Sequence, residues 1–413
     1  MAVAMLLGAC AVLAGTASPA LAVTLERVSV GPGGVQADND SFLPVISPDG
    51  RYVAFGSNAT NLVPGDTNGV KDVFLRDRQA GETERVSLGQ GDVQGNAISY
   101  GVTMSADGRF VAFASYATNL VPGDTNGLID LFVRDRRTHQ TERVNVATGG
   151  AQANTALDVP AHVPVIAAGG RFVAFDSYAT NLVPGDTNGV HDIFVRDRTA
   201  GTTERVNLGP GGAQADADSY WPSISADGRF VAFVSYAQNL APGSGGAQSN
   251  IYLRDRMTGI TTLVPRTGNA SGQLLSADGS ILAFNTVTDH VFVYDRRTGG
   301  IRQVDLTPAR GQANGPSFLY ALAPGGLNVG FISDATNLVP GDTNGLDDAF
   351  VRDLNTGRTV RVSLTADGAQ LHTHIEGGMS ISAGARFVAL GTRAPSLVPG
   401  DTNRRIDIFV RAR

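Results

Sequence analysis

The sequence predicts an all-β protein, a seven-bladed β-propeller of four-stranded antiparallel blades, within a chain of 413 residues. Three observations predict it. One short text recurs seven times, each copy reads as four strands separated by turn residues, and a segment before the first copy supplies a strand that the last copy lacks. A fixed period indicates a repeat architecture, and four-stranded units stacked around an axis form a propeller. Six blades are the alternative.

Two markers define the repeat. The first is an Arg-aromatic-Val-Ala-Phe text, present with variations at residues 51–55, 109–113, 171–175, 229–233, 281–284, 328–331 and 386–390. The second, a Val-Phe-Leu-Arg-Asp-Arg text, follows each first marker and ends at Arg78, Arg136, Arg198, Arg256, Arg296, Leu354 and Arg413. Both markers count seven units, of which the fifth is shortened.

Each unit contains the residue pattern of four short strands. In the first unit we expect them at residues 43–47, 52–56, 72–76 and 83–88, separated by turn sequences such as Pro48-Asp49-Gly50. The second strand is apolar at consecutive positions, which is typical of a strand buried on both faces. Blades packed face to face create that environment.

The two ends of the repeat region complement each other. Residues 24–30 match the fourth-strand text at 83–87, and the last unit stops at its third strand, residues 406–411. We therefore expect the N-terminal segment to complete the seventh blade and to hide the sheet edges that an open array would expose.

The first 22 residues differ from the rest. They are apolar and uncharged and end in a small-residue Ala-Leu-Ala text, which predicts a signal peptide over residues 1–22 and a single propeller domain over 23–413. We therefore expect a secreted, periplasmic or cell-envelope protein without a transmembrane span in its mature form. Lipid anchoring through Cys10, which ends a Leu-Gly-Ala-Cys text, is the alternative.

Composition excludes some classes of partner and site. The formal charge of −6 argues against nucleic acid, whose phosphates require a basic surface. Cys10 is the only cysteine, so residues 23–413 hold neither disulfides nor a cysteine zinc site. We expect a monomer.

The text Ser47-Pro-Asp-Gly-Arg-Tyr-Val-Ala-Phe55 resembles the WD40-like (PD40) repeat of the TolB-like propeller family. Close copies begin at Ser105 and Ser225, and the resemblance extends over nearly the whole chain after residue 22. The resemblance implies a propeller, and it implies periplasmic or extracellular scaffolds that bind proteins or accompany hydrolase domains.

A long loop between the second and third strands carries the strongest candidate site. Asp66 and Asn68, a Gly at residue 69 and then Asp72 give the hard oxygen ligands and the sharp bend that calcium prefers. The match is incomplete because Pro64 stands where the first acid belongs, and a structural turn is the alternative. The predicted calcium ligands are Asp66, Asn68, Asp72, Asp124, Asn126, Asp130, Asp186, Asn188, Asp192, Asp342, Asn344 and Asp348.

Three other features are candidates for binding. A Gln recurs before six of the seven first strands, as at Gln36, and either ties neighbouring blades together or lines an oxygen-rich rim. His372 and His374 would lie on the same side of a strand, the arrangement of two zinc ligands. Tyr220 and Trp221 lie at the start of the first strand of the fourth unit, where they either pack in the core or line the channel mouth.

No nucleophile elbow, zinc-protease helix or phosphate-binding Gly loop is present in the sequence. The leading expectation is therefore a non-enzymatic, exported propeller that binds a protein or a cell-envelope glycan through one loop face. The alternative is a polysaccharide-active hydrolase or lyase with its site at the channel mouth. A wall or matrix component that is stabilised by its calcium sites is a third interpretation. An unrepeated cluster of acids, histidines and aromatics at one end of the channel would favour the enzyme.

Overall fold

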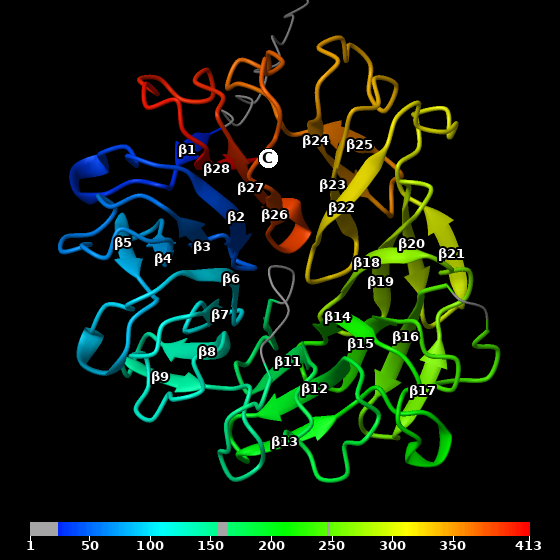
Figure 1. Cartoon of the computed structure of the whole chain (residues 1–413). Coiled ribbons are helices and arrows are strands. Elements are labelled where there is room, and N and C mark those ends of the chain that lie inside the picture. Colours follow the sequence, from blue (N-terminus) through cyan, green and yellow to red (C-terminus); the bar gives the residue numbers. More distant parts are fainter. Residues whose placement is uncertain (1–23, 156–162, 246–247) are drawn as a thin grey trace, which may run out of the picture.

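The computed structural model describes residues 24–155, 163–245 and 248–413, and it confirms the seven-bladed propeller. Seven four-stranded antiparallel sheets surround a central axis (Figure 1). The predicted signal peptide lies outside the described residues.

Blades 1 to 4 follow one another along the chain. Their strands are β2 (Ser41–Ile46), β3 (Tyr52–Ser57), β4 (Asp72–Asp77) and β5 (Glu82–Arg85) in blade 1; β6 (Ser99–Met104), β7 (Phe110–Ser115), β8 (Asp130–Asp135) and β9 (Gln140–Arg143) in blade 2; β10 (Val165–Ile166), β11 (Phe172–Ser177), β12 (Asp192–Asp197) and β13 (Thr202–Arg205) in blade 3; β14 (Ser219–Ile224), β15 (Phe230–Ser235), β16 (Asn250–Asp255) and β17 (Ile260–Leu263) in blade 4. In every blade the first strand is innermost.

Blades 5 to 7 complete the ring. Their strands are β18 (Ala270–Leu275), β19 (Ile281–Thr286), β20 (Val291–Asp295) and β21 (Gly300–Gln303) in blade 5; β22 (Ser317–Leu322), β23 (Asn328–Ser333), β24 (Asp348–Asp353) and β25 (Thr359–Arg361) in blade 6; β26 (Met379–Ile381), β27 (Phe387–Thr392), β28 (Asp407–Ala412) and β1 (Leu25–Arg27) in blade 7. Short 3-10 turns occur at η1 (Pro32–Gly34), η2 (Gln90–Asp92), η3 (Pro210–Gly212) and η4 (Ala383–Ala385).

The N-terminal strand closes the ring, as the sequence predicts. Strand β1 pairs antiparallel with β28, and Leu25 lies opposite Arg411. The buried Ser29 hydroxyl donates to Asp407 at 2.6 Å across the same junction. Blade 7 therefore combines strands from both ends of the chain, and no blade in the described structure is left with three strands.

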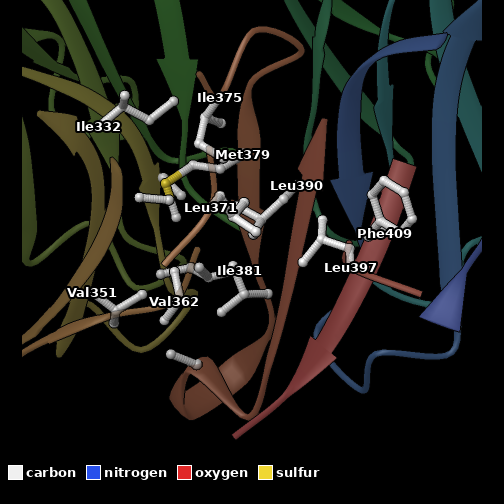
Figure 2. Packing of buried hydrophobic residues seen from close by; sticks show 14 of the residues in the cluster. Ile332, Val351, Val362, Leu371, Ile375, Met379, Ile381, Leu390, Leu397 and Phe409 are labelled. Atoms are coloured by element: carbon white, nitrogen blue, oxygen red, sulfur yellow. The ribbon is translucent and has the colours of Figure 1, made fainter. Parts of the chain in front are cut away.

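The core lies between the blades rather than inside any one of them. Phe55 of β3 and Phe74 of β4 are fully buried and stack with ring centroids 6.1 Å apart. Figure 2 shows the cluster between blades 6 and 7, where Val351 and Val362 face Met379 and Ile381. Each apolar face of a blade is covered by the next blade, which explains why the second strands are apolar at consecutive positions.

The channel on the axis is apolar at the end formed by the tight first turns. A cavity of about 380 Å³ there is lined by side chains such as Ile46, Met104, Ile224 and Ile381 from the innermost strands. In the described part of the chain, no helix is long and apolar enough to cross a membrane.

Candidate functional site

The long second-to-third-strand loops and the blade-to-blade loops share one face of the propeller. Gln36 donates to the Gly400 carbonyl at 2.6 Å, and Gln94 donates to Asp66 at 2.8 Å. Gln152 and Gln214 make the corresponding bonds to Gly123 and Gly185. These glutamines therefore tie neighbouring blades together, one of the two roles considered for them.

An arginine lies between the two acids of each loop predicted to bind calcium. The guanidinium of Arg85 lies 3.0 Å from Asp66 and 3.4 Å from Asp72. Asn68 donates to Asp72 at 2.9 Å, so the three predicted ligands of this loop do come together. Burial raises the pKa of Asp66, and the charge of Arg85 opposes that rise.

The same arrangement recurs in the three other predicted loops. The arginine-to-acid distances are Arg143 to Asp124 3.1 Å and to Asp130 2.9 Å, Arg205 to Asp186 2.9 Å and to Asp192 2.8 Å, and Arg361 to Asp342 3.0 Å and to Asp348 3.1 Å. Asn126, Asn188 and Asn344 donate to the second acid of their loops. A calcium ion would therefore have to share these acids with a guanidinium, and calcium binding stays a prediction.

Aromatic side chains gather where the innermost strands begin, at the mouth on the loop face. Trp221 is 38% exposed, Tyr320 41% and Phe318 47%. Trp221 adopts a left-handed backbone conformation, with φ 52°. Leu43 (φ 51°) and Gly101 (φ 63°) hold the same place in the first strands of blades 1 and 2, so this conformation belongs to a β-bulge of the repeat. Of the two roles considered for Trp221, the structure supports the one at the channel mouth.

Blade 5 leaves a cleft between two of these aromatics. Its second and third strands are joined by the short turn 287–290, where blade 1 has the loop 58–71. Its first strand carries Ser271 and Gly272 where blade 4 has Tyr220 and Trp221. The result is a cleft of about 320 Å³ bounded by residues that include Trp221 and Tyr320.

The cleft combines aromatic walls with amide groups. Gln273 and Asn285 line it, and both are more than nine-tenths buried. The side-chain amide of Gln273 donates to the Trp221 and Ala232 carbonyls, but its Oε1 is buried without a donor among the described residues. A buried acceptor without a donor costs free energy, so a ligand hydroxyl or a water molecule would be stabilised at this oxygen.

A histidine–aspartate pair lies one strand outward from the cleft. His290 Nδ1 lies 2.7 Å from Asp305 Oδ2, and Asp305 is fully buried. Asn285 of the cleft donates to the His290 carbonyl at 3.1 Å, which connects the pair to the cleft wall. A carboxylate that fixes one imidazole nitrogen orients the other for proton transfer, as in general acid–base catalysis.

This pair is unique among the repeats. In blade 1 the corresponding positions hold Asp72 and Ser87, whose hydroxyl donates to that acid at 2.5 Å. His290 therefore replaces the acid of the repeat and Asp305 replaces its hydroxyl partner. The sequence reasoning missed both residues. The signal that would have found them is a position where a repeated pair changes its chemistry on both sides.

A second polar cluster lies beside Trp221 on its blade 3 side. His191 Nδ1 lies 3.2 Å from Asp176, both residues are buried, and the imidazole lies against the ring of Tyr220 with centroids 4.9 Å apart. Burial, together with hydrogen bonds to Tyr178 and Asp218, raises the pKa of Tyr220 well above its usual range. Tyr220 therefore stays protonated, and its ring lies beside that of Trp221, with the centroids 6.1 Å apart.

The two predicted zinc ligands, His372 and His374, lie in a loop rather than on a strand. His374 Nδ1 lies 3.1 Å from Asp347 Oδ2. Within the described ranges, no three His, Cys, Asp or Glu side chains come together as a metal site. His374 instead adds a third histidine–aspartate pair to the loop face.

Comparisons with known proteins agree with the fold. No family model matches the chain, and no curated protein is similar to it in sequence. Among solved structures, the match to an oligogalacturonate lyase from Vibrio parahaemolyticus covers 95% of this chain and 97% of the lyase chain, with a TM-score of 0.56 and 12% identity. An oligogalacturonate lyase in complex with manganese covers 95% and 96%, with a TM-score of 0.54 and 13% identity.

A chain assigned as TolB from Agrobacterium tumefaciens covers 68% of this chain and 84% of its own, at a TM-score of 0.42 and 16% identity. A likeness that weak carries no argument here. The matches to the two lyases agree with the propeller fold of this chain. The narrower resemblance to the TolB-like family rests on the sequence text around residues 47–55.

The neighbours correct the expectation of a non-enzymatic scaffold. Propellers that match nearly the whole chain are lyases, so the lack of a known catalytic motif in a repeat sequence is no ground for excluding an enzyme. The physical reason for the error is that a propeller assembles its site from single residues of different blades. At 12–13% identity the likeness shows the fold alone, and any activity must be argued from the site.

Manganese in one neighbour raises the question of whether this chain could hold that ion. Divalent manganese prefers several oxygen and imidazole ligands around one point. His191, His290 and His374 are each held by one aspartate, and no third acid or histidine joins any of these pairs in the described part of the chain. The residues near the cleft do not fit a manganese site, and no chemistry is assigned to a metal.

Proposed function

We propose that this propeller is a polysaccharide-active enzyme, a lyase that cleaves a uronic-acid glycan in the cleft of blade 5. The observation that carries the proposal is the unrepeated cluster at the mouth, where an aromatic-walled cleft is flanked by His290–Asp305 and His191–Asp176. The activity of the two lyases of the same fold supports the choice of reaction.

The cleft lining favours a lyase over a hydrolase. Glycoside hydrolases use a pair of carboxylates on either side of the scissile bond. Among the described residues that line the cleft there is no Asp or Glu, whereas a tyrosine hydroxyl and two amides are present. These groups can bind a sugar carboxylate and hydroxyls and can donate a proton.

We assign the roles from the chemistry of the groups, with His290 adjoining the cleft wall through Asn285. Trp221 offers a flat apolar face to a sugar ring, and Gln273 offers an acceptor to a hydroxyl. His290, held by Asp305, is our candidate base for the proton on the carbon next to the sugar carboxylate. The electron pair released there forms a carbon–carbon double bond as the glycosidic bond breaks. Tyr320 then donates a proton to the leaving oxygen.

Tyr320 is suited to the role of an acid. Burial, with the negative charge of Asp347 nearby, raises the pKa of Tyr320, so its phenol keeps its proton at neutral pH. General acids and bases of this kind contribute about 10²- to 10⁴-fold to a rate.

The test is to incubate the purified propeller with polygalacturonate, its oligomers and alginate. Both the ultraviolet absorbance of the unsaturated product and the release of reducing ends would be measured. A lyase raises both signals together, and a hydrolase raises only the reducing ends. If neither signal appears with any uronate glycan, the proposal is wrong.

Gly272→Leu provides a steric control for the location of the site. A Cβ added at Gly272 meets nothing within 4 Å, and its φ is not in the left-handed region, so the larger side chain fits the fold and fills the cleft. We expect this variant to melt like the parent and to lose the activity. Full activity would place the reaction elsewhere.

A further inference from the structure

Blade 6 carries a second groove on its outer surface, along the strand that lies farthest from the central channel. Its volume is about 990 Å³, and it runs along the outermost strand β25 from the turn at Thr356–Arg358 to the loop at Gly368–Gln370. Strand β25 lies at the open edge of its sheet, in the orange part of the ring in Figure 1.

Blade 1 provides an internal reference for this groove. A smaller hollow of about 330 Å³ lies along β5, lined by Glu84, Asp92, Arg134 and Arg136 among others. There the acids neutralise the arginines, because Glu84 pairs with Arg136 and Asp92 pairs with Arg134.

Both acids are missing from the groove of blade 6. The repeat places Val360 where blade 1 has Glu84, and Gly368 where it has Asp92. Arg411 and Arg413 correspond to Arg134 and Arg136. Arg411 is 8% exposed and donates to the Leu364 and Thr365 carbonyls, with no carboxylate within ion-pair distance in the described structure.

The loss of acids extends to the neighbouring interface. In four blades a glutamate of the outermost strand clasps an arginine of the next blade, in the pairs Glu26–Arg78, Glu84–Arg136, Glu142–Arg198 and Glu204–Arg256. In β21 the corresponding residue is Arg302, which meets the Leu354 carbonyl at 3.1 Å. A glutamate has been replaced by a residue of opposite charge.

Three arginines line the groove itself, namely Arg352, Arg358 and Arg361. Arg352 lines the groove, is 7% exposed and donates to the Leu306 carbonyl and the Thr359 hydroxyl. Burial, with the charges of Arg310 and Arg302, lowers the pKa of Arg352. Arg358, which is exposed, also lines the groove, and its charge lowers the pKa of Arg413.

Three acids limit the basic surface. Asp342 and Asp348 neutralise Arg361, the third arginine of the lining. Asp367 lies on the adjoining loop, where it accepts the Thr365 hydroxyl. In the described structure, no carboxylate lies within ion-pair distance of Arg302, Arg310, Arg352, Arg358, Arg411 and Arg413, although the charge of Asp353 acts on Arg413.

We infer that this groove binds a carboxylate-bearing glycan chain as a site separate from the cleft. The groove extends along the whole of β25, and its lining includes Arg352 and Arg358 near one end and Arg361 on the strand, so it suits an extended polymer with single charges better than one phosphate. Guanidinium groups bind carboxylates through two parallel hydrogen bonds. The choice of polymer rests on the proposed function, because a lyase gains from holding a long substrate outside its cleft.

The variant Val360→Glu tests the inference by restoring the acid of blade 1. The new carboxylate should pair with Arg413 as Glu84 pairs with Arg136, which offsets part of the packing that Val360 makes against the core between blades 6 and 7, and the melting temperature of the variant is measured to show that it is folded. Arg358→Gln removes a cation instead. Arg137→Gln, which changes an exposed arginine of blade 2, is the matched control.

Binding is measured by electrophoresis of the native protein through gels that contain polygalacturonate or its fully esterified, neutral form. We expect retardation by the acidic polymer only, weakened about two- to fivefold in both groove variants, the equivalent of losing one exposed ion pair, and unchanged in the control. Equal retardation of all four proteins overturns the inference. Loss of retardation in excess inorganic phosphate at constant ionic strength would also overturn it, since it would assign the groove to a phosphate.

The two proposals fail separately. If the groove variants lose binding while no glycan is cleaved, the groove stands and the proposed lyase does not. If short oligomers are cleaved by every variant but none binds the acidic gel, the lyase stands and the groove does not.

Discussion

His290 Nδ1 lies 2.7 Å from Asp305 Oδ2, at a position where blade 1 has an aspartate and a serine. If this imidazole is the base, His290→Gln should lower kcat by at least about 10²-fold and leave KM nearly unchanged. Asp305→Asn should cause a similar loss, because the amide no longer fixes the imidazole. The rate of product formation, measured on oligogalacturonates, checks both. His374→Gln, in the separate pair with Asp347, is the control that should retain activity.

Trp221 and Tyr320 both line the cleft, and substitutions of the two residues should change different kinetic constants. Trp221→Ala removes a flat binding face, so KM should rise more than kcat falls. Tyr320→Phe removes only the hydroxyl, so kcat should fall with little change in KM. If both variants change the same constant, the separate assignment of binding and proton donation is wrong.

Val28 holds the strand that closes the ring. It is fully buried among Ala389, Ile408 and Val410 of blade 7. Val28→Ala should lower the free energy of unfolding by about 2 kcal/mol, because two methyl groups leave a close-packed interface. Denaturant titration measures this change. Val35→Ala, which alters a side chain that is 55% exposed, should have little effect.

Acid should weaken the fold through repeated arginine–aspartate pairs. Arg171 donates to Asp197 at 2.6 Å and lowers the pKa of that carboxyl to about 2, against the opposing effect of burial. A carboxyl whose pKa is lower in the folded state stabilises the fold above its unfolded pKa of 3.8, and this contribution is lost as the pH falls from 3.8 to about 2.

Arg171→Gln should therefore lose less stability than the parent over that pH interval, although it is less stable at neutral pH. Melting temperatures at closely spaced pH values give the comparison, and Arg137→Gln is the control. Parallel curves for the parent and Arg171→Gln would show that the pair does not contribute.

The calcium prediction can be tested through the arginine that shares the loop acids. If calcium binds the native loops, millimolar calcium should raise the melting temperature relative to a chelator. Arg85→Gln removes the guanidinium 3.0 Å from Asp66, so this variant should respond more strongly. No response in either protein would refute calcium and would leave arginine as the cation of the loop.

Much of the fold could be predicted from the sequence because it is repeated. The marker at residues 51–55 occurs in every unit in some form, and each occurrence is buried by the same neighbours. The pairing of residues 25–27 with β28 also followed from a repeated text. Because the same marker recurs in seven units, the irregularities of single copies matter little, and the seven copies together predict the number of blades.

The candidate site escaped prediction because it consists of departures from the repeat. Gly272 creates space by lacking a side chain, and the short turn before His290 creates space by lacking a loop. Whether such omissions open a cleft depends on Trp221 and Tyr320 from the adjoining blades. Contacts between blades are set by three-dimensional packing and are absent from the text of any single unit.

The pairing of β1 with β28 has a consequence for how the molecule forms. Ser29 and Asp407 are 378 residues apart, and bringing such distant points together in a flexible chain costs about 5 kcal/mol of loop-closure entropy. During synthesis β1 stays unpaired until β28 has been made. A circular permutant that makes β1 and β28 neighbours in sequence should reach the same native state without that delay, and the difference in refolding time would measure how much the junction governs assembly.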